Sequence, residues 1–190
     1  MNRQVKINRF IAIVYCLFFC LNVEGQKIFM PDYSLNSIIK IEDTTGISNF
    51  LPNGNIIQQY VIDKNERVYI LFTNLDKTEY AKAIFHEGTY FTFYEIEFGK
   101  MDKILYNEVS IKLPIKHFIT ESGVFLDMTK NELFDLKGNN TIFVYDNSLC
   151  YCYNSNKDVG GKSIKDCEYI YKVTFAEDRV SKIHFGFQPL

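Results

Sequence analysis

Three cysteines near the C-terminal end are the residues whose type and spacing could do chemistry. Cys150 and Cys152 are two positions apart, and Cys167 follows across a polar loop. On a strand, Cys150 and Cys152 would share one face. In an exported protein, three cysteines indicate one disulfide and either a spare thiol or an intermolecular bond. From the pairing register we predict a Cys152–Cys167 disulfide. The alternative is a zinc site with His184, but the Cys-x-Cys spacing does not match common zinc patterns, so we expect no metal.

Acid–base chemistry would have to use scattered residues. His86, His117 and His184 are the only imidazoles, and none lies in an H-E-x-x-H motif. No serine lies in G-x-S-x-G. His117 suits a hydrogen-bonded structural role better than that of a base. Glu95 and Glu97 share one strand face and could form a glycosidase-like carboxylate pair, although two acids on a solvent-facing strand are the commoner arrangement. We therefore assign no catalytic residues.

The segment Asp158-Val159-Gly160-Gly161-Lys162-Ser163 imitates the end of a phosphate-binding loop. That motif needs a glycine where Asn156 stands, together with a preceding parallel strand and a following long helix that the sequence does not indicate. A surface loop is the better interpretation, and we expect no nucleotide or other cofactor.

The aromatic surplus of 13 Tyr and 17 Phe has two interpretations. Inward-facing rings would make the core, and an outward set would make a binding patch. If Cys150 and Cys152 face the core, Tyr151 and Tyr153 face the other way. We name Tyr151 and Tyr153 as a possible contact surface.

Short aromatic and β-branched segments separated by turns must position these groups. Residues 56–62 and 67–73 flank a polar four-residue loop and predict a hairpin. Residues 79–86 and 89–98 predict a second strand pair. Ala81, Ala83 and the charges of the first segment would also suit a helix, but the hairpin partner that follows closely after Gly88 favours a strand. In the strand over 89–98, strict alternation puts Phe93 on the same face as the two glutamates.

The C-terminal end predicts a further hairpin, with alternating aromatic and aliphatic residues over 169–175 and 180–187. One helix is predicted over 130–137, because Thr129 can cap it, Glu132 can complete a capping box and Gly138 can end it. The sequence thus predicts an α+β fold: a mainly antiparallel, twisted sheet with one or two short helices packed on one face.

The stretch from Thr120 to Gly138, TESGVFLDMTKNELFDLKG, resembles the G-[IV]-x-L-G-M-[ST]-x-x-E-[VL]-x-x-x-x-G pattern of SmpA/OmlA-like, β-lactamase-inhibitor-like exported proteins. The likeness covers residues 120–190, and exported proteins of Bacteroidota-type bacteria with uncharacterised roles look similar over nearly the whole mature length. Asp127 stands where the pattern has glycine. The resemblance implies a capped helix followed by strands and a hairpin, and a role in non-catalytic binding or membrane-assembly support.

Residues 1–25 have the form of a signal peptide. Arg3, Lys6 and Arg9 precede an apolar run over 10–23, and Gly25 stands at the cleavage site, so that the mature chain is expected to begin at Gln26. The run is short for a membrane-spanning helix, and we expect no permanent membrane span.

A lipoprotein signal is the alternative interpretation of this leader. It would make Cys16 or Cys20 the lipidated first residue. That processing requires a small residue before the cysteine, whereas Tyr15 and Phe19 stand there.

Cleavage would leave residues 26–190 as one domain. Its 18 basic and 22 acidic residues, out of 21 and 23 in the whole chain, give a net charge of −4. No basic stripe remains for phosphates, so we expect no nucleic-acid partner. The leading hypothesis is a secreted or periplasmic, non-enzymatic protein that contacts another envelope or extracellular protein. The alternatives are a secreted hydrolase with a dispersed acidic site and a carrier of a metal or small ligand.

Overall fold

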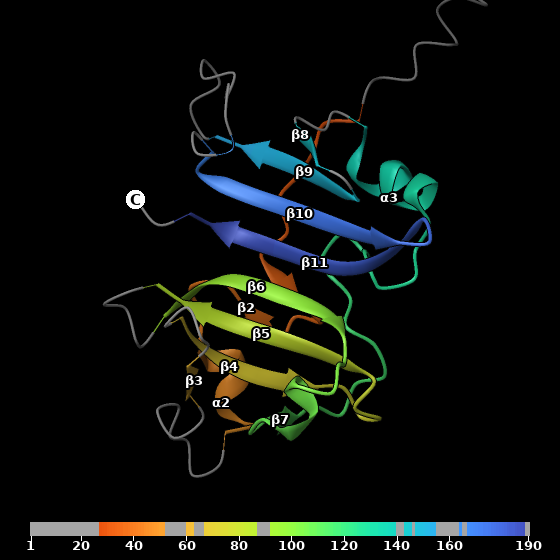
Figure 1. Ribbon diagram of the computed structural model, residues 1–190. Coiled ribbons are helices and arrows are strands. Elements are labelled where there is room, and N and C mark those ends of the chain that lie inside the picture. Colours follow the sequence, from red (N-terminus) through yellow and green to blue (C-terminus); the bar gives the residue numbers. More distant parts are fainter. Residues whose placement is uncertain are drawn as a thin grey trace, which may run out of the picture.

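A large open β-sheet dominates the fold (Figure 1). The computed structural model describes residues 27–51, 60–62, 67–86, 92–139, 143–145, 147–154, 164 and 167–188. The strand order along the sheet is β3-β4-β5-β6-β11-β10-β9-β8, with β7 added beside β4. All neighbours in this order are antiparallel, and β7 alone pairs in parallel.

The first half of the sheet is a meander of consecutive strands: β3 (Tyr60–Ile62), β4 (Val68–Thr73), β5 (Glu79–Phe85) and β6 (Phe93–Lys100). The pairing of β3 with β4 confirms the first predicted hairpin over its described residues. The strand predicted over 79–86 is β5, which pairs with β6. Residues 52–59 and 63–66 lie outside the described residues.

The second half is another meander of consecutive strands: β8 (Phe143–Tyr145), β9 (Ser148–Tyr153), β10 (Tyr169–Ala176) and β11 (Arg179–Phe187). The predicted C-terminal hairpin is confirmed by the pairing of β10 with β11. The two meanders join where β11 pairs with β6, so the chain's last strand lies in the middle of the sheet.

One face of the sheet, which we call the covered face, carries the main core. Behind the first meander, in the view of Figure 1, lie the small hairpin of β1 (Ser34–Leu35) and β2 (Ile39–Lys40) and the short helix α2 (Thr45–Ser48). The second meander is covered by α3 (Lys130–Lys137) and by the N-terminal segment, whose Phe29 stacks on Tyr151 at a centroid distance of 4.8 Å. Alternate residues of all the long strands enter this core.

The strict alternation predicted for β6 is wrong at one point. The register between β5 and β6 shifts between Ile84 and Phe85, so that Ile84 opposes Glu95 while Phe85 opposes Phe93. The extra residue, Tyr94, turns Phe93 into the core, whereas Glu95 stays on the opposite face. A bulge of this kind is set by strand pairing and leaves no mark in the hydrophobic pattern.

Helix α3 begins and ends as predicted. Thr129 Oγ1 accepts a hydrogen bond from the Glu132 amide, and the Glu132 carboxylate accepts one from the Thr129 amide, which completes the capping box. Gly138 follows with φ of 78°, and a Cβ there would lie 2.2 Å from the Lys27 carbonyl oxygen. Only glycine therefore fits where the N-terminal segment crosses the helix end.

The predicted α+β class is right in part. The mainly antiparallel sheet is present, but it dominates the described residues, in which α2 has 4 residues and α3 has 8. No helix within the described ranges is both long and apolar enough to cross a membrane. The predicted leader and its cleavage position, Gly25 and Gln26, lie outside the described residues.

Candidate functional site

The face of the sheet opposite the covered face, here called the open face, carries most of the ionisable side chains of the central strands. Over the first meander, a turn of 3-10 helix (Leu105–Asn107) packs Leu105 on Tyr69, Leu71 and Tyr80 and closes a small second core. Over β6, β11, β10 and β9 the register brings these open-face residues together: Glu95, Glu97, Lys182, His184, Ile170, Lys172 and Cys150.

Glu95 lies between two histidines. Its Oε1 is 2.9 Å from His86 Nε2, and its Oε2 is 2.5 Å from His184 Nε2. A carboxylate accepts hydrogen bonds, so each Nε2 carries the proton. Burial alone would raise the pKa of Glu95, but the hydrogen bonds and charge of His184 and then of His86 outweigh it and lower the pKa below its ordinary value. Glu95 is therefore a fixed anion that orients both rings.

Glu97 is the second acid of this face, and its carboxylate is also held by neighbouring side chains. Lys82 Nζ lies 3.8 Å from Oε1, Lys182 Nζ lies 3.4 Å from Oε2, and the Tyr80 hydroxyl donates to Oε1 at 3.0 Å. Burial opposes ionisation here too, yet the charges of Lys182, His184 and Lys82 and the Tyr80 hydrogen bond lower the pKa of Glu97. The predicted proximity of Glu95 and Glu97 on one face is correct, and both are held as carboxylates.

A groove of about 250 Å³ lies on the open face beside Glu95. Ile170 and Cys150 supply apolar surface, and Lys172 and His184 supply polar groups. Lys172 forms no ion pair with any of the described residues. The groove therefore places apolar side chains beside a cation that has no ion-pair partner among the described residues.

The Cys150 thiol is buried in the wall of this groove and takes no part in a disulfide. Burial raises its pKa to about 11, against the smaller opposing effect of Lys172. The thiol is therefore protonated at neutral pH, and a protonated thiol is a poor nucleophile. Cys150 acts here as a small apolar side chain.

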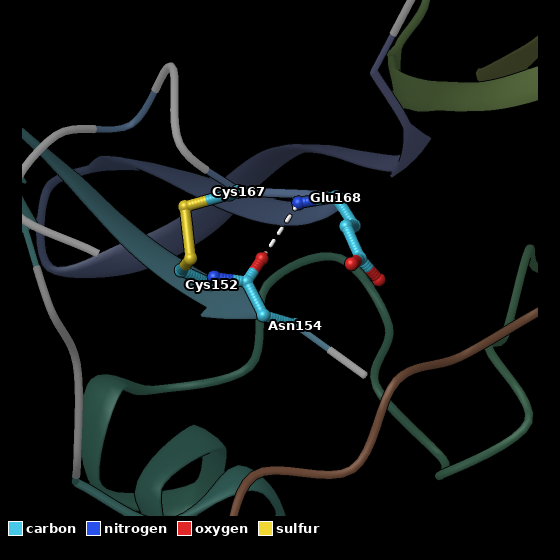
Figure 2. Close-up of a disulfide and its surroundings, with 4 residues drawn as sticks. All are labelled: Cys152, Asn154, Cys167 and Glu168. Atoms are coloured by element: carbon cyan, nitrogen blue, oxygen red, sulfur yellow. Dashed lines mark hydrogen bonds between the residues drawn. A yellow bond between two sulfur atoms is a disulfide. The ribbon is translucent and has the colours of Figure 1, made fainter. Parts of the chain in front are cut away.

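The predicted disulfide is present. Cys152 and Cys167 are bonded, with their Cα atoms 5.5 Å apart (Figure 2). Beside them the Glu168 amide donates to Asn154 Oδ1 at 2.8 Å, so a covalent and a hydrogen-bonded link both join the end of β9 to the start of β10 (Figure 2). No group of three or more His, Cys, Asp or Glu side chains among the described residues is arranged to hold a metal ion, and the disulfide consumes two of the proposed zinc ligands.

The contact surface predicted at Tyr151 and Tyr153 is wrong for Tyr151. Cys150 and Cys152 lie on the open face, so the tyrosines point to the covered face, where Tyr151 is fully buried and its hydroxyl donates to the Gly138 carbonyl at 3.0 Å. Tyr153 lies at the strand end and is 39% exposed. The alternating pattern correctly predicted that the two cysteines and the two tyrosines point to opposite faces of the sheet. It is Tyr151 that fills the core, because its aromatic side chain buries more apolar surface than a cysteine does.

His117 stands apart from this face and makes a hydrogen-bonded structural contact. Its Nδ1 lies 2.7 Å from Glu79 Oε1, and the Phe118 amide donates to Glu79 Oε2 at 2.8 Å. The loop over 158–163 lies outside the described residues.

Sequence reasoning missed the part of the site that depends on long-range pairing. Glu95 and His184 meet only because the last strand pairs with β6, and Lys172 joins them through the next strand. The alternation of charged and apolar residues on β10 and β11 was the available signal.

Comparisons with known proteins found no matching family model, no matching curated protein and no matching solved structure.

Proposed function

We propose that this protein is an exported, non-enzymatic binding protein, secreted or periplasmic, which contacts another envelope or extracellular protein through its open face. The observation that carries the proposal is the state of the ionisable groups there. Glu95 and Glu97 are engaged by neighbouring cations and N–H groups, while an apolar groove remains beside them. Such an arrangement suits recognition by shape and charge.

The same groups are poorly suited to hydrolysis. A glycosidase-like pair needs one carboxyl whose pKa is raised, so that it can donate a proton, and one that stays ionised. Here the pKa values of Glu95 and Glu97 are both lowered. The Cys150 thiol is unsuited to nucleophilic catalysis, because burial raises its pKa and keeps it protonated at neutral pH. These directions favour binding over catalysis.

Export is supported by the form of the leader and by the disulfide. Disulfides persist in oxidising compartments and are rare in the cytosol. Intact-mass measurement of the exported chain tests this part: a mature N-terminus at Gln26 is expected, and a lipid-modified Cys20 would contradict it.

Partner capture from the native envelope, followed by mass spectrometry, tests the binding role. The double charge reversal Lys172→Glu/Lys182→Glu changes the open face, and Lys130→Glu changes the exposed surface of α3 as a matched control. We expect the first variant to lose proteins that the wild type and the control retain. Equal capture by all three, with unchanged thermal melts, would show that the open face is not the contact surface.

A further inference from the structure

We propose that the groove on the open face binds a small organic acid with an apolar tail, its carboxylate held by Lys172 and its tail lying against Ile170 and Cys150. This inference stands apart from partner binding, because it concerns a free small molecule and can be tested on the isolated protein.

The cation is the first reason. Lys172 lies on β10, directly across from His184 on one side and Cys150 on the other, and it is exposed. On the same face, Lys82 and Lys182 lie within 4 Å of Glu97, whereas Lys172 has no ion-pair partner among the described residues. An ammonium at the edge of an apolar groove favours an anionic ligand group.

The neighbouring acid does not prevent this. Glu95 lines the groove, but His86 and His184 donate to its two oxygens. These hydrogen bonds offset its charge toward a second carboxylate. The His184 side chain is 30% exposed, and its Nδ1 makes no hydrogen bond to the described residues.

The apolar walls of the groove indicate that the part of the ligand beyond its carboxylate is apolar. Ile170 is the neighbour of Lys172 two positions earlier on β10, Cys150 lies across from Lys172 on β9, and both Ile170 and Cys150 line the groove. A volume of about 250 Å³ is smaller than that of drug-sized pockets and fits a short acyl or single-ring acid. A purely hydrophilic anion such as phosphate would leave these walls uncovered.

Binding of hexanoate, hexan-1-ol and hexylammonium, each titrated into the ¹⁵N-labelled mature protein and followed by NMR, tests the proposal. We expect hexanoate to shift the amides of Lys172, His184 and Gly186 at millimolar concentration, and to bind at least about tenfold more tightly than the alcohol or the amine, the factor that one charge-assisted hydrogen bond supplies. Equal affinity for the three probes, or shifts that do not centre on the groove, would overturn the proposal.

Two lysine variants separate the site from general electrostatics. Lys172→Met keeps the length of the side chain and should weaken hexanoate binding about tenfold. Lys182→Met removes a cation from the same face and should leave it nearly unchanged. Equal effects of the two substitutions would refute a specific role for Lys172. The peptide acetyl-Ala-Ala-Leu with a free carboxylate serves as a further probe: tighter binding than hexanoate would assign the groove to a polypeptide C-terminus and overturn the small-acid proposal.

Discussion

Lys137 and Asp32 form an ion pair inside the protein, with Nζ 2.6 Å from Oδ2 and both side chains 1% exposed. Lys137 also donates to the Met30 carbonyl at 2.7 Å and lies over the Tyr171 ring at 4.6 Å from its centroid. The other Asp32 oxygen accepts from the Ser122 amide at 2.7 Å. Helix α3, the N-terminal segment and the loop before the helix thus meet at one buried charge pair.

Breaking this pair is expected to be costly. Lys137→Met leaves Asp32 buried without its cation, and Asp32→Asn leaves Lys137 without its anion, so each should lower the free energy of unfolding by about 3–5 kcal/mol. The double variant should cost clearly less than the sum, because neither charge is then left unpaired. Urea denaturation of the three variants measures this. Strictly additive effects would show that the two side chains are not coupled.

The cap of α3 gives a second prediction. Thr129→Ala removes the hydroxyl that accepts from the Glu132 amide, and we expect a loss of about 1 kcal/mol in the free energy of unfolding. Thr129→Ser keeps the oxygen and serves as the matched control, with an effect of a few tenths of a kcal/mol. If serine and alanine destabilise equally, the hydroxyl does not cap the helix.

Short sequence patterns correctly predicted the features that neighbouring residues determine. The capped helix, the C-terminal hairpin and the Cys152–Cys167 disulfide each depend on residues close in sequence, and each is present. Asp127 adopts φ of 67°, a backbone conformation in which glycine is favoured. This conformation gives that position a backbone requirement that the side-chain pattern alone does not show.

The features that the sequence did not reveal depend on contacts between residues far apart in the chain. Lys137 ends a helix in a place that ordinarily faces solvent, and only the position of Asp32, far away in the sequence, explains its burial. Tyr151 and Cys150 are both suitable for a core, and the layer that covers the sheet decides which of them enters it. The contact of Glu95 with His184 needs the β6–β11 pairing, which no local pattern specifies.

The Glu95 cluster predicts how stability depends on pH. The folded-state pKa of Glu95 lies below its ordinary value of 4.5, so in acid the unfolded chain binds more protons than the folded one. The contribution of Glu95 to stability is therefore complete above pH 4.5 and is lost as the pH falls through the folded-state value. Glu95→Gln should be less stable than the wild type at pH 7, and the difference should shrink in acid. Urea midpoints measured from about pH 7 to 3 test this; a difference that stays constant would contradict it.

The disulfide gives the last prediction, and it bears on where the protein functions. Cys152 and Cys167 are 15 residues apart, and closing a loop of that length stabilises by roughly 3 kcal/mol on the chain-entropy model. Cys152→Ala and Cys167→Ala should therefore destabilise by similar amounts, and the double variant should cost little more, because each single change already removes the bond.

Cys150→Ala is the matched control, since it removes a buried sulfur without touching the bond, and it should cost roughly 1 kcal/mol. Thermal melts of the wild type with a reductant and with a zinc chelator complete the test. The reductant should lower the melting temperature to that of the single variants, because it breaks the disulfide. The chelator should leave the melting temperature unchanged, because a chelator destabilises a fold only by removing a bound metal. Sensitivity to the chelator without sensitivity to the reductant would replace the disulfide with a metal site and favour a metal carrier over the binding protein proposed here.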